Sequence, residues 1–447
     1  MRRAIWSSIK SQLIDFYLGH KSQMLRRKIA EKRRKKAGNP HQITVYLRIN
    51  DPHSYLLLQV LSQLKSRFDV QYDFRTVFNL QSDMYPAPEL WRQQAFTDTC
   101  YLAQRYGLRP PQHPTANLVA HEPAITAQLL HWELQPGYLQ NALAVFDDYW
   151  QNRETDLIAR LMPEVTGQIA CYQHHLLANE AQLKHSGHYL SAIMHYGGEW
   201  YWGLNRLQYL ERRLNSVLQV TQPDVIYDRA HRDFCRLDAA HPAASMSDSI
   251  SVSEPVVLYW SIRSPYSYLG LVRLQKLCQH YNVTLVVKPV LPMVMRRMAV
   301  PKNKRQYILF DAKREADQMG IAFGRICDPL GKGVERCYAL FDYAQEQGKG
   351  IDFLATYARA VWSQGIDSAS DFGLRQIVQS VGLDWHKAQA LLHDESWRLW
   401  AQDNLAEMYG EGLWGVPSMT FAGTKLFGQD RIDALEHAIV AAQSAVQ

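Results

Sequence analysis

The order of apolar and polar positions along the chain predicts an α/β protein. In the second half, an apolar run at Val256–Trp260 precedes a turn, a helical periodicity over 268–281 and a second apolar run over 284–289, which is the pattern of a β-α-β unit. Further helices are expected over 305–319, 334–347, 351–362 and 371–381, then strands over 418–421 and 425–427 and a helix from Asp430. The predicted order is therefore β-α-β, a helical insertion, and β-β-α.

This pattern occurs twice. Residues 43–56 match residues 256–269 at an offset of 213, and residues 196–207 match residues 421–432 at an offset of 225. Because ordered matches run through both halves, and 12 extra residues fit in loops of the helical middle, we expect two homologous domains. The expected divisions are a basic amphipathic extension (1–42), a first domain (43–215), a linker of small and polar residues (216–254), and a second domain (255–447) on which the first packs.

Positive charge is concentrated at the N-terminal end. Residues 1–40 carry twelve Lys and Arg against two acids, a balance of +10, whereas the other 407 residues hold 37 basic and 41 acidic side chains. A nucleic-acid-binding surface over the whole protein is therefore not expected. Apolar positions at helical spacing accompany the charge, at Ile5, Trp6, Ile9, Leu13, Phe16 and Tyr17. Such a helix either contacts an anionic membrane or nucleic acid, or packs on the first domain with its basic end in solvent.

Apolar runs and cysteines restrict the class of protein further. No apolar run approaches the roughly 18 residues that cross a bilayer, and the N-terminal residues lack the unbroken apolar core of a secretory signal. The six cysteines include no Cys-x-x-Cys pair and are too sparse for a disulfide scaffold. These features favour a cytoplasmic location.

The turn that opens the first helix of the second domain is the candidate site, and it reads Ser264, Pro265, Tyr266, Ser267. A helix N-terminus offers unpaired N–H groups and the positive end of the helix dipole, so it stabilises a thiolate or another anion. The second marker is Val416-Pro417 entering a strand, because proline cannot continue a strand ladder and cis X-Pro bonds are kept at such positions. In the alternative interpretation, Ser264 is an N-cap followed by proline at the first helical position.

Three motifs carry a resemblance to a known family, and they are Ser264-Pro265-Tyr266-Ser267, Val416-Pro417 and Asp430-Arg431. The order of elements resembles the DsbA-like thioredoxin fold, and the motifs are similar to those of kappa-class glutathione transferases and 2-hydroxychromene-2-carboxylate isomerases. The resemblance covers 255–447 well and 43–215 in outline. It implies two tandem DsbA-like thioredoxin domains, each with a helical insertion, and a glutathione-dependent transferase or cis–trans isomerase that acts on a small electrophilic or conjugated substrate.

The resemblance also implies a role for each residue of these motifs. Ser264 would donate a hydrogen bond to the glutathione sulfur, and a hydroxyl donor of this kind stabilises a thiolate and lowers its pKa. The backbone at Val416 and Pro417 would pair with the cysteinyl peptide like an added strand. Asp430 and Arg431 would hold the γ-glutamyl amine and carboxylate. The thiolate then attacks an electrophile permanently, or adds reversibly to a conjugated alkene and permits bond rotation.

The sequence departs from the family after the second strand. The family carries an Asn in a Gly-Asn-x-Pro-Pro stretch near the substrate, and residues 292–302 lack it. Arg296, Arg297 or Lys302 would then offer a different anion site, so the family's substrate is not carried over.

The first domain is expected to be inactive. Asp51 occupies the position of Ser264, Ser191-Ala192 replaces Val416-Pro417, and Asn205-Arg206 replaces Asp430-Arg431. A carboxylate at this position would repel a thiolate. We therefore expect the first domain to be a structural partner of the second.

Two other classes of protein remain as alternatives. One is a non-catalytic thioredoxin-fold binding or scaffold protein, and the other, less favoured, is a thiol-disulfide oxidoreductase, since neither turn contains a cysteine. No metal is expected, because the histidines show no zinc spacing. They are instead expected on a solvated helix face, and their positions are His174, His175, His185 and His188.

Overall fold

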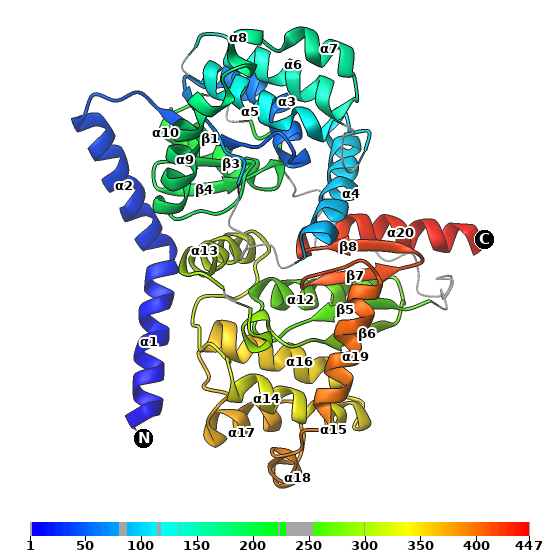
Figure 1. The fold of residues 1–447 in the computed structure, drawn as a ribbon. Coiled ribbons are helices and arrows are strands. Elements are labelled where there is room, and N and C mark those ends of the chain that lie inside the picture. Colours follow the sequence, from blue (N-terminus) through cyan, green and yellow to red (C-terminus); the bar gives the residue numbers. More distant parts are fainter. Residues whose placement is uncertain are drawn as a thin grey trace. The chain divides into compact units, whose positions relative to one another are not determined.

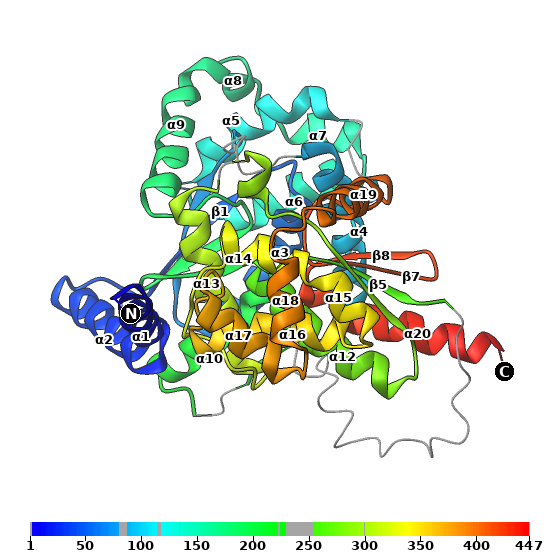
Figure 2. The same ribbon diagram turned by 90° about the horizontal axis from the view of Figure 1, so that it is seen from below.

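A computed structural model describes residues 2–79, 87–113, 118–133, 135–221, 224–228, 254–298 and 300–446 (Figures 1 and 2). The chain divides into two compact units. The N-terminal unit comprises 25–229 and 301–304, and the C-terminal unit comprises 1–24, 230–300 and 305–447. Most of the expected linker lies outside the described residues, and helix α10 (Leu207–Val217) extends to its first positions.

The N-terminal unit contains a four-stranded mixed sheet in the order β2-β1-β3-β4. Its strands are β1 (Gln42–Leu47), β2 (Gln71–Thr76), β3 (Ile193–Tyr196) and β4 (Glu199–Trp202). Strand β1 runs parallel to β2 and antiparallel to β3. The helices of this unit are α3 (Pro52–Arg67), α4 (Pro88–Tyr106), α5 (Glu122–Trp132), α6 (Tyr138–Trp150), α7 (Glu154–Arg160), α8 (Pro163–Thr166), α9 (Ile169–His185) and α10.

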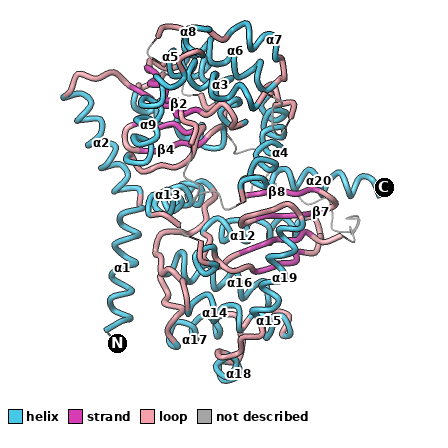
Figure 3. The backbone as a smooth tube through the Cα atoms, in the orientation of Figure 1, coloured by secondary structure: helices cyan, strands magenta, loops and turns pink. Residues whose placement is uncertain are grey.

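The C-terminal unit repeats this plan with a sheet in the order β6-β5-β7-β8. Its strands are β5 (Val256–Trp260), β6 (Leu285–Pro289), β7 (Ser418–Phe421) and β8 (Thr424–Phe427). The helices are α12 (Pro265–His280), α13 (Lys302–Gln318), α14 (Lys332–Ala339), α15 (Phe341–Glu346), α16 (Gly350–Arg359), α17 (Asp371–Ser380), α18 (Trp385–Leu391), α19 (Trp397–Gly410) and α20 (Ile432–Val446). The predicted α/β class and the β-α-β, helical, β-β-α order are confirmed in both units (Figure 3).

The offsets read from the sequence reappear in the strand register. Thr44 pairs with His195 in the first sheet, and Val257 pairs with Thr420 in the second. The first partners differ by 213 and the second by 225, which are the two offsets of the repeat. Each unit also has an equivalent hydrogen bond from a tryptophan. Trp150 Nε1 donates to the carbonyl of Ile49 in the first unit, and Trp362 Nε1 donates to the carbonyl of Ile262 in the second. The two sheets are therefore built by equivalent residues.

The sheet of the C-terminal unit is covered on both faces. Side chains alternate between the faces of a strand, so Leu258 and Trp260 of β5 enter the main core with helix α12, whereas Tyr259 packs with Met408 of α19 on the other face. Trp260 is fully buried. This packing fixes the end of β5, which is where the turn to α12 begins.

Some boundaries differ from those predicted. Helix α12 begins at Pro265 rather than at 268, because proline suits the first helical position and its missing N–H costs nothing there. The stretch 334–347 forms two helices, α14 and α15, which meet at Leu340, and no Gly or Pro marks that break. Helix α16 ends at Arg359 and continues as a π-helical turn, Ala360–Gln364.

The N-terminal residues form two helices, α1 (Arg2–Leu18) and α2 (His20–Lys36). Leu18 joins the core of the C-terminal unit, and Arg27 donates two hydrogen bonds of 2.8 Å to Glu199 of β4 in the N-terminal unit. Among the described helices, none has both the length and the hydropathy that crossing a bilayer requires.

Candidate functional site

Ser264 lies between the end of β5 and the beginning of α12. Its backbone is extended, with φ −97° and ψ 114°, and its Oγ accepts a hydrogen bond of 3.1 Å from the backbone N–H of Ser267. Ser264 is therefore an N-cap, as the alternative interpretation holds. A hydroxyl has one hydrogen to donate and two lone pairs, so capping occupies a lone pair and leaves the O–H available as a donor.

Val416 and Pro417 lie against this turn. The peptide bond between them is cis, and the carbonyl oxygen of Val416 is 3.5 Å from Ser264 Oγ. That distance is long for an O–H···O hydrogen bond, whose usual length is about 2.7–2.8 Å. The structure thus brings Ser264 and Val416 together and leaves the Ser264 hydroxyl without a strong acceptor among the described residues.

The turn that carries Asp430 and Arg431 is tied to the same helix. Arg273 of α12 donates to the backbone carbonyl of Gln429 at 2.6 Å and to its side chain at 2.8 Å. A Cβ placed on Gly270 of α12 would lie 3.5 Å from Pro417 and 3.6 Å from Gln429. Both distances are ordinary van der Waals separations, so the Pro417 loop and the Gln429 turn both pack beside Gly270 on the helix that Ser264 begins.

Asp430 and Arg431 differ in exposure. Asp430 is half-buried, and its Oδ1 accepts a hydrogen bond of 2.5 Å from Gln429 Nε2. Arg431 is buried, and its Nη1 donates to the carbonyl of Asp430 at 3.1 Å. Arg206 makes the equivalent bond to the carbonyl of Asn205. This bond is common to both units, so it supports the turn whatever binds there.

Several side chains around the turn were not selected from the sequence. Ser267 Oγ accepts from the backbone N–H of Ser261 at 3.4 Å, and Ser54 does the same for Arg48 in the other unit. The sequence did carry a sign of this shared role, because serine occurs at both equivalent positions, 54 and 267. Tyr266 donates to Asp311 of α13 at 2.7 Å, and periodicity gave no indication of that contact.

The three basic residues offered as an anion site lie in different surroundings. Arg296 ends a 3₁₀ turn after β6, its Nε is buried without a hydrogen-bond partner, and its Nη1 lies 3.4 Å from the hydroxyl of Tyr409. Arg297 is exposed in the left-handed conformation, with φ 62°, and Lys302 is exposed at the first residue of α13. Arg296 and Ser264 both follow the carboxyl ends of neighbouring parallel strands, the edge at which open α/β sheets bind ligands.

The equivalent position in the N-terminal unit is closed. Asp51 is the N-cap of α3 and only 2% exposed. Its carboxylate accepts hydrogen bonds from the Ser191 hydroxyl at 2.6 Å, the Ser54 hydroxyl at 3.1 Å and the backbone N–H of His53 at 3.0 Å. Ser191 thus contacts Asp51 where Val416 lies beside Ser264, and the carboxylate is fully engaged.

The buried cysteines of the C-terminal unit are core residues. Burial raises the pKa of the Cys278 thiol to about 12 and raises that of Cys337 well above its usual value. Both side chains belong to the main apolar core. They are therefore protonated at neutral pH and unsuited to thiol exchange.

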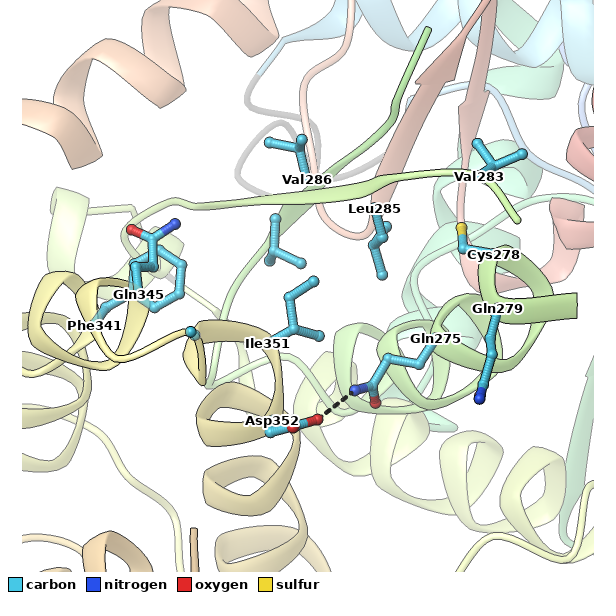
Figure 4. A pocket seen from close by; sticks show the side chains of 13 residues that line it. Gln275, Cys278, Gln279, Val283, Leu285, Val286, Phe341, Gln345, Ile351 and Asp352 are labelled. Atoms are coloured by element: carbon cyan, nitrogen blue, oxygen red, sulfur yellow. Dashed lines mark hydrogen bonds between the residues drawn. The ribbon is translucent and has the colours of Figure 1, made fainter. Parts of the chain in front are cut away.

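A cavity of about 540 Å³ lies at the other end of α12 (Figure 4). Its walls are Val283, Leu285 and neighbouring apolar side chains, and Gln275 bonds Asp352 at the rim. An α-helix rises about 1.5 Å per residue, so the part of α12 that lines the cavity, from Gln275 onward, lies more than about 15 Å along the helix axis from Ser264. The cavity is separate from the candidate site.

The histidines lie on a solvated helix face only in part, so the prediction was wrong for His188 and not for the whole cluster. His188 is fully buried beyond the end of α9, and His175 Nε2 lies 2.9 Å from Oε2 of Glu133. Burial raises the pKa of Glu133, and hydrogen bonds from Thr76 and Asn179 oppose that shift. His174 and His185 are exposed as expected. Glu133 precedes the histidines by more than 40 residues, so local spacing could not reveal it.

Comparison with known proteins places the C-terminal unit in a fold family. Residues 255–440 match the model of the DSBA-like thioredoxin domain. A 2-hydroxychromene-2-carboxylate isomerase of Sphingobium xenophagum is 25% identical over 197 residues, which are 41% of this chain and 97% of that protein. The enzyme of the same name from Pseudomonas putida is 27% identical over 201 residues, 41% of this chain and 93% of that protein.

A solved structure of 2-hydroxychromene-2-carboxylate isomerase is also similar, with 23% sequence identity and a TM-score of 0.38. The aligned part is 42% of this chain and 97% of the isomerase chain. The C-terminal unit carries a DsbA-like thioredoxin domain with a helical insertion. The N-terminal unit has the same sheet order and equivalent strand pairs. The chain is an α/β protein with two four-stranded mixed sheets of the same strand order.

Proposed function

We propose that the C-terminal unit is a glutathione-dependent cis–trans isomerase in which Ser264 stabilises the glutathione thiolate. The observation that carries the proposal is the Ser264 hydroxyl. Its lone pair caps α12, and among the described residues its O–H has only the distant carbonyl of Val416 as an acceptor. The N-terminus of the 16-residue helix α12 favours an anion beside it. The isomerases similar to this chain favour isomerisation as the reaction.

Glutathione would bind along the edge that the three motifs form. The N–H and C=O of Val416 would pair with its cysteinyl peptide, and Asp430 would accept hydrogen bonds from the γ-glutamyl amine. Arg431 is buried, so we assign it to supporting the Asp430 turn and, through that turn, to the γ-glutamyl carboxylate site. Each of these assignments is part of the proposal and is tested below.

The proposed reaction balances without an added oxidant or reductant. The thiolate adds to the β-carbon of a conjugated carbonyl compound, a C–S bond forms, and the alkene electron pair moves to the carbonyl oxygen as an enolate. The former double bond then rotates. Collapse of the enolate breaks the C–S bond, re-forms the alkene in the other geometry and releases the thiolate. Protonation of the enolate carbon instead would leave a stable conjugate, which is the transferase outcome.

Calorimetric titration of glutathione into the full chain tests the proposal. We expect saturable binding that is lost in Asp430→Ala. The matched control is Asp342→Asn, which alters an exposed carboxylate that bonds Trp400 away from the site. Absence of binding at millimolar glutathione would support the scaffold alternative. Reduction of insulin disulfides by the clean protein would support the oxidoreductase alternative.

The N-terminal unit has no part in this chemistry under the proposal. The Asp51 carboxylate stands at the position of the Ser264 hydroxyl and already accepts hydrogen bonds from Ser54 and Ser191. Desolvating a second negative charge beside it is unfavourable. We therefore expect one glutathione site per chain.

A further inference from the structure

Helix α1 packs with its less apolar face inward. Ser11 is 2% exposed, and Leu18, two turns further along α1, is also buried, as is Ser22 in the first turn of α2. Asp15, on this side, lies against Gly324. The opposite face carries Ile9, Leu13 and Phe16, and the latter two are 63% and 64% exposed. Helical spacing of three and four residues places these three side chains in one stripe.

Exposed apolar side chains are concentrated in this region. Seven of the seventeen large apolar side chains that are exposed among the described residues fall between positions 9 and 29. Scattered exposed apolar residues are ordinary, whereas a contiguous apolar surface indicates an interaction. Of the apolar positions that the sequence indicated in this helix, Ile9, Leu13, Phe16 and Tyr17 are exposed, and the side chains of Ile5 and Trp6 lie outside the described residues.

The charge around the stripe is positive. Lys10 of α1 and Lys21 at the beginning of α2 are exposed, and five further exposed basic residues follow along α2, at Lys28, Lys32, Arg33, Lys35 and Lys36. The two acids of the region do not offset this charge at the surface. Glu31 pairs with Arg34 at 2.6 Å, and Asp15 faces inward. The exposed surface thus combines apolar side chains with cations.

We propose that α1 and the beginning of α2 bind the surface of an anionic lipid bilayer. Ile9, Leu13 and Phe16 enter the boundary between headgroups and acyl chains, and the lysines contact lipid phosphates. A second copy of the chain fits poorly, because it would bring two segments of +10 together. A nucleic acid would satisfy the charge and leave the apolar stripe in water. This inference is independent of the proposed function.

Co-flotation of the full chain with vesicles tests the inference. Two compositions are compared, phosphatidylcholine alone and phosphatidylcholine mixed with phosphatidylglycerol. We expect binding to the mixed vesicles only, weakened by added salt because headgroup attraction is screened. The variant Leu13→Gln/Phe16→Gln should lower vesicle affinity at least about tenfold, since each side chain buries apolar area on binding.

A matched control separates the stripe from general hydrophobicity. Leu177→Gln/Leu399→Gln removes two side chains that are 50% and 71% exposed on other helices, and we expect it to bind vesicles as the wild type does. Far-ultraviolet circular dichroism verifies that all variants are folded. Absence of binding to anionic vesicles, or equal binding by Leu13→Gln/Phe16→Gln, would overturn the proposal. So would a wild-type dimer that the same variant converts to a monomer, because the stripe would then be an interface between copies.

Discussion

The hydroxyl oxygen of Ser264 lies 3.5 Å from the carbonyl oxygen of Val416, and the equivalent pair in the other unit, Asp51 and Ser191, is joined by a hydrogen bond of 2.6 Å. At this position the C-terminal unit leaves its hydroxyl without a short hydrogen bond to the facing residue, whereas the N-terminal unit has a short hydrogen bond there. In the C-terminal unit a neutral donor remains available beside a helix N-terminus. In the N-terminal unit a buried carboxylate has all its partners. This difference is the basis for assigning thiolate chemistry to one unit.

Replacing Ser264 with alanine should affect both catalysis and stability. Loss of a hydrogen bond to a charged sulfur costs about 1.5–3 kcal/mol, so glutathione-dependent turnover should fall roughly ten- to hundredfold. Loss of the N-cap should lower the free energy of unfolding by about 1 kcal/mol. Steady-state kinetics and urea unfolding measure the two effects.

The control is Ser370→Ala, because Ser370 caps α17 through the same 3.1 Å bond, to the backbone N–H of Gly373. We expect it to lose similar stability and to keep full turnover. Equal turnover in Ser264→Ala and Ser370→Ala would remove the catalytic role of Ser264.

The variant Ser264→Asp should separate capping from thiolate binding. Aspartate caps helices as well as serine does, so the fold should retain its stability to within a few tenths of a kcal/mol. Its carboxylate would repel the thiolate, as we also expect of Asp51 in the N-terminal unit, and glutathione-dependent turnover should become undetectable. Ser264→Asn, a neutral cap, serves as the comparison. Substantial activity in Ser264→Asp would contradict a thiolate at this position.

Asp51→Ala should destabilise the N-terminal unit more than Ser264→Ala destabilises the other. The change removes the acceptor of the Ser191 and Ser54 hydroxyls and of the His53 N–H, all at a buried position. Each buried donor left unsatisfied costs about 1–3 kcal/mol. Chemical denaturation measures the loss, and glutathione binding should be unchanged. A gain of a second glutathione site in Asp51→Ser would contradict the assigned inactivity.

Acidification should destabilise the N-terminal unit through His195. Burial, followed by the charge of Arg213, lowers the pKa of His195 to about 4. The unfolded chain, with an ordinary histidine pKa of about 6.5, then binds the proton more readily than the folded one. The free energy of unfolding therefore falls as the pH decreases from about 6.5 to 4, by up to about 3 kcal/mol, since each tenfold change in proton affinity is worth about 1.4 kcal/mol.

His195→Phe keeps an aromatic ring beside Trp200, since the ring centroids of His195 and Trp200 are 4.5 Å apart. This variant should show a smaller fall in the free energy of unfolding between about pH 6.5 and pH 4. The control His393→Phe alters an exposed histidine of the other unit. A profile that is equally steep in wild type and His195→Phe would show that other groups govern acid unfolding.

Sequence reasoning was most accurate where the repeat constrained it. The strands Val256–Trp260 and Ser418–Phe421 appear with the predicted bounds, because two aligned copies fix register as well as periodicity. Residues 200–202 align with the strand expected over 425–427, and they lie in strand β4, where Tyr201 is fully buried. The family resemblance implied one site for Ser264 and Val416, and in the structure the two residues are neighbours.

Other features depend on contacts that periodicity does not encode. The carboxylate beside His175 comes from Glu133, at the end of α5, and buried His188 was misplaced on a solvated face. The hydrogen bond from the Ser191 hydroxyl to Asp51 depends on the rotamers of both side chains. The sequence indicated only that the residue types at these two positions differ from those of the other unit. The sequence indicated the apolar positions of α1, but it did not indicate which face of the helix is buried. That face is set by tertiary contacts of Ser11 and Leu18.

The most direct test of the central claim is the thiol pKa of glutathione bound to the full chain, followed by thiolate absorbance as the pH is raised. We expect the bound thiol to ionise at lower pH than free glutathione, and we expect this decrease to be smaller in Ser264→Ala and unchanged in Ser370→Ala. Bound glutathione that ionises at the same pH in wild type and Ser264→Ala would contradict the account.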